Sequence, residues 1–242
     1  MKNIKKLNVK IFLDTANLKI IKNSLKKYPF IKGFTTNPSL MHKEGVRNYK
    51  KFTEEALKNS SNLPISFEVF SDDLEQMEEE ARIIHSWGGN SYVKIPITNT
   101  KGKSTKKLIK SLTDDGIKVN VTAIFTTRQL ENILNYFNSS TPAIISVFAG
   151  RIADSGIDPI NVMKKCRKII NKKKNLELLW ASSREVVNII HSIQTKCHII
   201  TISPDILDKI KLFNKNLNQF SLETVKDFYK DAKNAGFNII NK

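Results

Sequence analysis

Short runs rich in β-branched and aromatic residues recur along this chain at even spacing, and segments with helical periodicity separate them. Eight strand-like runs can be counted: Lys10–Ala16, Ile31–Thr36, Ile65–Phe70, Tyr92–Thr98, Lys118–Phe125, Ala143–Ala149, Glu177–Ser182 and His198–Ser203. The intervening segments with helical spacing are Val46–Asn59, Asp73–Trp87, Ser104–Asp115, Thr127–Phe137, Pro159–Asn171 and Arg184–Thr195. Strands that alternate with helices form right-handed parallel units, so the sequence predicts an α/β fold of the (β/α)8, or TIM-barrel, type.

A doubly wound open sheet is the alternative arrangement of the same elements. Such sheets usually carry a glycine-rich nucleotide-binding turn after the first strand, and the segment Leu13–Lys19 contains no glycine. No linker interrupts the composition, so residues 1–242 are expected to form a single domain. An additional C-terminal helix is predicted within Phe220–Asn238, with Ser221 as its N-cap and Gly236 as its C-cap.

The balance of charge raises the question of a polyanionic partner, because the formal net charge is +17. Lysines are spread over almost every polar segment, whereas arginine, the preferred reader of phosphates and bases, occurs at only six positions. This pattern is typical of solvated helix surfaces. We therefore expect no specific nucleic-acid partner, and nonspecific polyanion binding is the alternative.

Features that would direct the chain to a membrane or a metal are missing from the sequence. No apolar run is long enough to span a bilayer, and Asp14 and Asn17 interrupt the first apolar segment, so no signal peptide is expected. The cysteines, Cys166 and Cys197, lack CxxC spacing, and the four histidines form no metal-binding pattern. These observations favour a cytoplasmic protein that uses no metal and no cofactor.

Polar residues fall near the carboxyl ends of the strand-like runs, where barrels of this type assemble their active sites. They are Asp14, Asn37, Glu68, Lys94, Asn120, Thr122, Ser146 and Ser182. Each one alone has an ordinary structural explanation, as a helix cap, a turn residue or a satisfied hydroxyl. Their recurrence from strand to strand predicts a polar site at one end of the barrel.

Lys94 is the most unusual of these residues, because it lies in the apolar run Ser91–Thr98 with no acidic residue close in sequence. A buried ammonium must reach the surface with its head group, find a partner, or lose its proton. Strands of a parallel barrel are buried on both faces, so we expect Asp14, Glu68 and Lys94 to meet in the interior.

Four segments then resemble a known family. They are Gly33–Leu40 (GFTTNPSL), Val93–Pro96 (VKIP), Asn120–Thr122 (NVT) and Ser146–Arg151 (SVFAGR). In this order they resemble the class I transaldolase and fructose-6-phosphate aldolase family, and the resemblance runs from about Ile11 to the C-terminal helix. It implies an enzyme on a TIM barrel that forms a Schiff base with sugar phosphates and forms homo-oligomers.

The resemblance also implies catalytic roles. Lys94 matches the Schiff-base lysine, which needs a neutral amine, and an apolar strand supplies the desolvation that favours one. Glu68 matches the general acid/base, which works through a water activated with Thr122, and Asp14 matches the carboxylate that handles the substrate hydroxyl proton. The positions implied for substrate binding are Asn37, Asn120, Ser146 and Phe148.

A phosphate site is expected after the sixth and seventh strands, where Arg151, Ser182 and Arg184 match the family's phosphate-binding positions. A guanidinium fork and the amides of a helix N-terminus can converge there on an anion. The alternative is that Arg151 pairs with Asp154 and Arg184 with Glu185 or an acid of a neighbouring strand.

The function implied is a transferase that moves a dihydroxyacetone unit from a ketose phosphate to an aldose phosphate. The transferase branch of the family carries glutamate and phenylalanine at Glu68 and Phe148, whereas the aldolase branch carries glutamine and tyrosine. A lyase that releases dihydroxyacetone is the alternative within the family, and a noncatalytic phosphosugar-binding or polyanion-binding barrel is the alternative outside it. Relatives usually carry an aromatic residue at Ser183, so the donor sugar and the pathway, pentose phosphate or glycan precursor, stay open.

Overall fold

The eight strands found in the described residues form one closed barrel. The computed structural model describes residues 8–239. The strands are β1 (Lys10–Asp14), β2 (Ile31–Thr35), β3 (Ile65–Glu68), β4 (Ser91–Pro96), β5 (Val119–Ile124), β6 (Ala143–Val147), β7 (Leu176–Trp180) and β8 (Ile199–Ile202). Each strand pairs in parallel with the next one in sequence, and β8 pairs with β1. The predicted (β/α)8 barrel is confirmed, and the doubly wound sheet is not formed.

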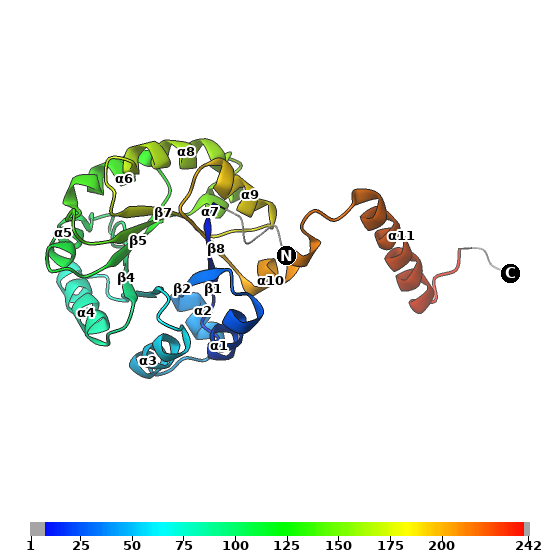
Figure 1. The fold of residues 1–242 in the computed structure, drawn as a ribbon, viewed down its shortest axis with the longest axis horizontal. Coiled ribbons are helices and arrows are strands. Elements are labelled where there is room, and N and C mark those ends of the chain that lie inside the picture. The colour runs from blue at the N-terminus through cyan, green and yellow to red at the C-terminus, as the bar shows by residue number, and fades with distance from the viewer. Residues whose placement is uncertain (1–7, 240–242) are drawn as a thin grey trace.

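Helices surround the barrel on its outside (Figure 1). They are α1 (Leu18–Lys27), α2 (Pro38–Lys43), α3 (Tyr49–Asn59), α4 (Leu74–Ser86), α5 (Lys106–Asp114), α6 (Thr127–Ile133), α7 (Ala149–Asp154), α8 (Pro159–Ile170), α9 (Val187–Gln194) and α10 (Pro204–Lys209), with 3-10 turns η2 (Leu134–Tyr136) and η3 (Ile210–Leu212). The segment predicted as one helix over Thr127–Phe137 is α6 followed by η2. No helix in the described residues is long and apolar enough to cross a membrane.

Side chains from the loops fix where many helices begin. Asn17 caps α1, Asn37 caps α2, and Thr126 forms a capping box with Gln129 at the start of α6. Asn37 belongs to a turn that leaves β2, and Pro38 then occupies the first position of α2, where a missing N–H costs nothing. These caps set the points at which the chain leaves the strand ends, so they also shape the rim of the barrel.

The core has two parts. Apolar side chains between the strands and the helices make a large shell, and a smaller cluster fills the inside of the barrel. The inner cluster consists of Phe12, Tyr92, Ile144, Leu179, Ala181 and Ile199, with Phe148 packed against it. Gly33 leaves room for it, since a Cβ at that position would lie 2.5 Å from the Phe12 ring. The barrel interior is therefore a packed floor and not a channel.

The C-terminal helix α11 (Leu217–Asn234) extends away from the barrel, as the orange-red ribbon of Figure 1 shows. Its existence confirms the prediction, but its start does not. Asn216 caps the helix through the backbone N–H of Gln219, so the prediction of Ser221 as N-cap is wrong. The C-cap is Ala235, and Gly236 follows it with φ +69°. Asn216 and Ser221 are both residue types that favour an N-cap, so the residue type alone does not distinguish the two starts.

Candidate active site

One layer of polar residues lies above the apolar floor of the barrel. Side chains alternate along a strand, so positions two residues further along point the same way. In β1, β4, β6 and β8 the floor residues Phe12, Tyr92, Ile144 and Ile199 are followed two positions later by Asp14, Lys94, Ser146 and Thr201. The strand ends thus bring a ring of polar groups together at the carboxyl end of the barrel, as the sequence predicts.

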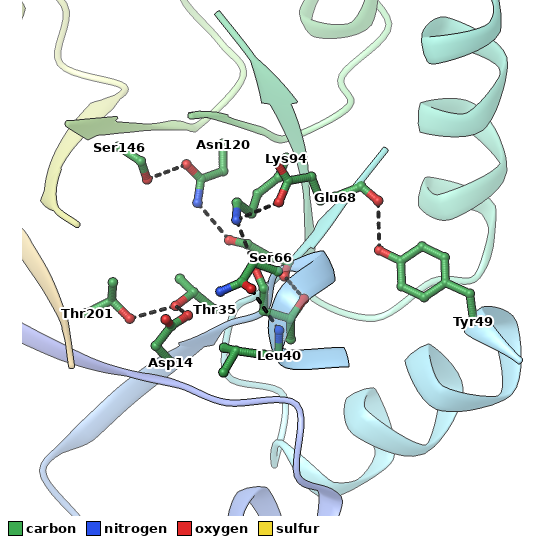
Figure 2. A network of polar contacts seen from close by, with 12 residues as sticks. Asp14, Thr35, Leu40, Tyr49, Ser66, Glu68, Lys94, Asn120, Ser146 and Thr201 are labelled. Carbon is green, nitrogen blue, oxygen red and sulfur yellow. Dashed lines mark hydrogen bonds and ion pairs between the residues drawn. The ribbon is translucent and has the colours of Figure 1, made fainter. Parts of the chain in front are cut away.

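Lys94 lies in this layer with only 6% of its surface exposed. Its Nζ donates to the backbone carbonyl of Thr36 at 2.9 Å and to Glu68 Oε2 at 2.9 Å (Figure 2). Glu68 and Lys94 are ladder neighbours in β3 and β4, so the parallel register itself makes this pair. The expectation that these charges meet is confirmed: the buried ammonium of Lys94 has Glu68 and the carbonyl of Thr36, the residue after β2, as its partners.

The backbone of Glu68 makes a further contact, with Tyr49. The hydroxyl of Tyr49, on α3, donates to the backbone carbonyl of Glu68 at 2.9 Å. The Tyr49 ring packs edge-on against Phe67 and Trp87, and burial beside the Glu68 charge raises the pKa of the phenol. This buried contact fixes the end of β3, and the carboxylate can exchange a proton with the adjacent amine across a short distance.

Asn120 is the neighbour of Lys94 on the other side, in β5. Its amide nitrogen donates to Ser66 Oγ at 2.9 Å, and its amide oxygen accepts from Ser146 Oγ at 2.6 Å (Figure 2). All three side chains are buried. Because both ends of the amide are bonded, Asn120 is fixed in one orientation beside Lys94.

Asp14 lies on the opposite side of the layer. The hydroxyl of Thr35 donates to Asp14 Oδ1 at 2.6 Å, and the hydroxyls of Thr35 and Thr201 lie 2.6 Å apart. Burial raises the pKa of Asp14, while the Thr35 hydrogen bond and the positive charge of Lys94 oppose that rise and the negative charge of Glu68 adds to it. Asp14, Glu68 and Lys94 therefore act on one another electrostatically inside one site.

Thr122 occupies an irregular part of β5. The pairing of β5 with β6 shifts register between Val121 and Ile124, and Ala123 has φ +58°. A bulge of this kind commonly re-aims a side chain at a functional site. Thr122 Oγ1 is buried and has no hydrogen-bond partner among the described residues, so it is available to a water or a ligand.

Arg151, Ser182 and Arg184 lie around the ends of β6 and β7. Arg151 lies over the ring of Phe148 at 5.5 Å from its centroid and is exposed. Arg184 Nε donates to the two carboxylate oxygens of Asp154 at 3.0 and 3.1 Å. Of the alternative pairings, that of Arg151 with Asp154 is wrong, because Asp154 pairs with Arg184. Arg184 does have an acidic partner, but this partner is Asp154, on the helix that follows the neighbouring strand β6, and not Glu185.

A close backbone contact positions Ser182. Gly150 N donates to the carbonyl of Ala181, and a Cβ at Gly150 would lie only 1.6 Å from the carbonyl oxygen of Ser182. Ser182 itself has φ +62°, in the left-handed region. Only glycine at position 150 allows the end of β7 to approach the start of α7 so closely.

A cavity of about 570 Å³ joins these groups at the carboxyl end of the barrel. Every residue predicted for the site lines it: Asp14, Asn37, Glu68, Lys94, Asn120, Thr122, Ser146, Phe148, Arg151, Ser182 and Arg184. A larger cavity of about 930 Å³ lies at the other end of the strands, with Lys10, Phe30 and His198 in its wall. The smaller cavity is the candidate active site, because it holds the buried lysine and both carboxylates.

No group of three or more histidine, cysteine, aspartate or glutamate side chains within residues 8–239 could hold a metal ion. The two cysteines are free, and burial raises the pKa of Cys166 to about 12 and that of Cys197 to about 11. Thiols with such values stay protonated and unreactive at neutral pH.

Several polar residues of the site are absent from the sequence prediction. They are Thr35, Tyr49, Ser66 and Thr201. Threonine and serine on strands look like ordinary strand residues, and Tyr49 lies in a predicted helix. The signal that the sequence does contain is spacing along the strand. Ser66 lies two positions before Glu68, and Thr201 lies two positions after the inward-facing Ile199.

Comparison with known proteins finds relatives that match most of the chain. A family model described as Transaldolase/Fructose-6-phosphate aldolase matches residues 11–239. The "Probable transaldolase" of Nitrosopumilus maritimus is 35% identical over 225 residues, which cover 92% of this chain and 96% of that protein. The "Probable transaldolase 2" of Listeria monocytogenes is 34% identical over 206 residues, which cover 84% of this chain and 88% of that protein.

The solved structures show the same fold at greater distance. The crystal structure titled KGPDC from Streptococcus mutans matches with a TM-score of 0.56 at 12% identity, covering 84% of this chain and 91% of that one. The fold, the extent of the family match and the identity to its relatives lead to one conclusion: the chain belongs to the transaldolase/fructose-6-phosphate aldolase family.

Proposed function

We propose that the chain is a transaldolase-type transferase that moves a dihydroxyacetone unit from a ketose phosphate to an aldose phosphate through a Schiff base on Lys94. The observation that carries the proposal is a buried lysine amine 2.9 Å from a carboxylate, in a cavity that also holds Asp14 and the arginines. Exposed lysines such as Lys110 also pair with carboxylates, so the feature that distinguishes Lys94 is the burial of its paired amine inside the cavity.

Schiff-base formation begins when Glu68 takes a proton from the Lys94 ammonium, which frees the amine to attack the ketone carbon. The carbinolamine hydroxyl then leaves as water, with a proton from Glu68, and the iminium forms. Thr122, whose buried hydroxyl has no partner among the described residues, holds that water together with Glu68. Asn37, Asn120 and Ser146 orient the substrate hydroxyls.

Carbon–carbon cleavage needs a base for the adjacent hydroxyl, and Asp14 is proposed for that step. Its carboxylate accepts the hydroxyl proton while the carbonyl of the released aldose phosphate forms. The electron pair of the broken bond moves into the iminium, which becomes the enamine. An acceptor aldose phosphate reverses these steps and receives the three-carbon unit, with Asp14 returning the proton.

The phosphate end of the sugar is proposed to bind Arg151, Ser182 and Arg184. Arg151 is free of carboxylate partners within residues 8–239, and its stacking on Phe148 leaves the guanidinium edge open to the cavity. Arg184 is tied to Asp154, so this pairing positions it and part of its fork remains for phosphate.

Borohydride trapping tests the Schiff base. We expect incubation with fructose 6-phosphate and reduction to leave a sugar-derived adduct on the peptide that contains Lys94, and Lys94→Arg to remove both adduct and turnover. Lys118→Arg is the control, because Lys118 is part-buried just before the neighbouring strand β5 and donates to Asn90 Oδ1 at the other end of the barrel. No adduct with any ketose phosphate would rule the mechanism out.

Transfer rather than release is proposed because of Phe148, whose phenyl ring can exclude water but cannot bind or orient it. We expect rapid turnover of fructose 6-phosphate only with an acceptor such as erythrose 4-phosphate. Phe148→Tyr should raise acceptor-independent release of dihydroxyacetone, whereas Phe148→Leu should lower stability without that change in product ratio. Equal release from the wild type with and without acceptor would favour the lyase.

The setting proposed for this activity is the pentose phosphate pathway of the cytoplasm, with sugar phosphates as the partners and no specific nucleic acid. We also propose that residues 1–242 work as one domain within a homo-oligomer. Support for the oligomer comes from α11, none of whose residues is buried in the described chain although several are large and apolar.

A further inference from the structure

Two threonine hydroxyls stand in line behind Asp14. Thr35 Oγ1 donates to Asp14 Oδ1 at 2.6 Å, and Thr201 Oγ1 lies 2.6 Å from Thr35 Oγ1 (Figure 2). The three residues come from β2, β1 and β8, and β1 lies between the other two strands in the barrel. Closure of the sheet therefore brings together hydroxyls that are 166 positions apart in sequence.

The direction of this chain follows from counting protons. A threonine hydroxyl carries one hydrogen, and that of Thr35 is given to the Asp14 carboxylate. The contact between the two hydroxyls can then form only if Thr201 donates and Thr35 accepts. A second contact holds Thr201 in place, because Ser183 Oγ donates to its backbone carbonyl at 2.8 Å.

We infer that Thr201 is a positioning residue of the reaction, which fixes the Thr35 hydroxyl as a donor to Asp14 and so keeps Asp14 an ionised carboxylate ready to accept the substrate proton. The inference rests on the proposed function for the role of Asp14 as base. Donors in series strengthen one another, so a Thr35 hydroxyl that accepts from Thr201 is a better donor to the carboxylate.

The need for such support comes from the position of Asp14. Burial raises its pKa, and so does the negative charge of Glu68 on β3. Lys94 on β4 and the Thr35 hydrogen bond act in the other direction, and Arg151 and Arg184 line the same cavity from the ends of β6 and β7. Without Thr201, the Thr35 hydroxyl is free to rotate toward the cavity, and the carboxylate loses part of the stabilisation that offsets its burial.

The pH dependence of turnover tests this inference. Thr201→Val removes the hydroxyl at nearly constant volume, and we expect the acidic limb of the kcat/KM profile to move to higher pH. At neutral pH we expect kcat to fall roughly threefold to tenfold, the effect of one hydrogen bond, with little change in KM. Thr201→Ser should restore the wild-type profile. If the valine variant does not fold, Thr201→Ala provides the same deletion.

A double-mutant cycle separates an effect through Thr35 from any other effect. In a Thr35→Val background, Thr201→Val should cause no further shift of the profile. Thr141→Val is the matched control: Thr141 is as buried as Thr201, at 5% exposure for both, and its hydroxyl donates to the carbonyl of Thr113. It should lower stability without moving the acidic limb.

A readout without substrate keeps the inference distinct from the proposed function. The titration of the Asp14 carboxyl can be followed by carbon-13 NMR, with Asp14→Asn to assign the signal, and we expect Thr201→Val to move it upward. If the wild type fails to turn over sugar phosphates, the proposed function is wrong, yet this titration still decides the hydroxyl chain. An unchanged titration in Thr201→Val, or an equal shift in the Thr35→Val background, would overturn the inference.

Discussion

Burial of the Lys94 and Glu68 charges lowers the stability of the fold, and the role proposed for Lys94 in catalysis explains why the pair is present. A buried ion pair seldom stabilises a protein more than well-packed apolar residues of similar volume, because both charges lose their hydration. Here both partners interrupt strands that are otherwise apolar, and the register of β3 and β4 sets them side by side. A reactive amine needs such an enclosure, and a structural residue does not.

Replacement of Asp14 is predicted to change stability and activity in opposite directions. Its folded pKa is raised, so the stability it contributes is present at low pH and is lost as the pH rises through that value. Asp14→Asn keeps an acceptor for Thr35 but removes the buried charge. We expect the variant to be more stable by about 1 kcal/mol near neutral pH, roughly 2–4 °C in Tm, and less active by about 10²–10⁴-fold.

Thermal unfolding from pH 4 upward checks this prediction, because the advantage of Asp14→Asn should grow as the pH rises from the ordinary pKa of an aspartate, about 3.9, through the raised pKa of the folded state. Glu55→Gln is the control, since Glu55 is exposed on α3 and its charge is solvated. A lower Tm for Asp14→Asn at every pH would show that the carboxylate stabilises the fold, contrary to the expectation.

At this scale the sequence predicts charged residues better than hydroxyls. A lysine or a carboxylate in an apolar strand is conspicuous, so Asp14, Glu68 and Lys94 can be found without a structure. Thr35 carries no such signal and Thr201 only its spacing from Ile199, because threonine is a common strand residue and the contact between the two depends on closure of the barrel. The pairing of Arg184 with Asp154 likewise depends on how β7 meets α7.

Among the elements, the junction of α7 with the end of β7 is the tightest, because Gly150 faces the Ser182 carbonyl. Gly150→Ala must push these segments apart. We expect the variant to lose about 1–3 kcal/mol of stability and to show a higher KM for phosphorylated substrates, with a smaller effect on kcat.

Steady-state kinetics and chemical denaturation measure both effects. Ala153→Gly, an exposed change in the same helix, is the control and should cost about 1 kcal/mol in stability with no change in KM. A Gly150→Ala variant with wild-type KM would show that the end of β7 can move without affecting phosphate binding.

The pairing of β7 with β8 includes an imidazole, which makes this part of the barrel sensitive to pH. The backbone N–H of Leu178 donates to His198 Nδ1 at 2.8 Å, so protonation of the ring breaks this bond. Burial, then the charges of Arg167 and Lys10, lower the pKa of His198, while Glu177 opposes them. The unfolded chain therefore takes up the proton first.

The lowered pKa of His198 determines how its contribution to stability changes with pH. The stability that His198 contributes is present above about pH 6.5, the ordinary value for histidine, and is lost as the pH falls through the lower folded value. We expect His198→Asn, whose amide oxygen can still accept from Leu178, to flatten the fall in unfolding free energy between pH 7 and pH 5. His85→Asn, on the exposed side of α4, should leave that slope unchanged.

The periodicity of the sequence predicts the positions of the strands and helices well, and their first and last residues less well. All eight predicted strands are present in the described residues, because an apolar run between turns has few other solutions. The helix expected from Val46 begins at Tyr49, since Asn48 caps it, and the helix expected from Arg184 begins at Val187. The start at Tyr49 depends on a capping contact, which periodicity does not contain, whereas α9 begins without a side-chain cap.

For the whole molecule, α11 is the feature that a single barrel does not explain. Phe228 and Tyr229 are 69% and 67% exposed, and Leu217, Leu222 and Val225 are exposed too. Removal of such side chains from water contributes about 25 cal/mol per Å² of apolar surface, and the entropic cost of association is set against this gain. We expect the wild type to be an oligomer in light scattering and Phe228→Asp to lower its mass.

Lys226→Asp, on the polar side of the same helix, is the control and should keep the wild-type mass. A monomeric wild type at micromolar concentration would contradict the proposal that second copies cover α11. The sequence predicts the helix from its periodicity, but its position outside the barrel requires the structure.

The rim of the barrel divides its tasks between different segments of the chain. The amine and the carboxylates belong to β1, β3 and β4, whereas the arginines follow β6 and β7. A designer could therefore exchange the segments around 148–158 and 181–187 to fit sugars that carry a carboxylate or no anion at all. Under the proposed function the reacting groups would stay on strands fixed by their own ladder, so such a barrel can serve as a scaffold for new carbon–carbon bond-forming catalysts.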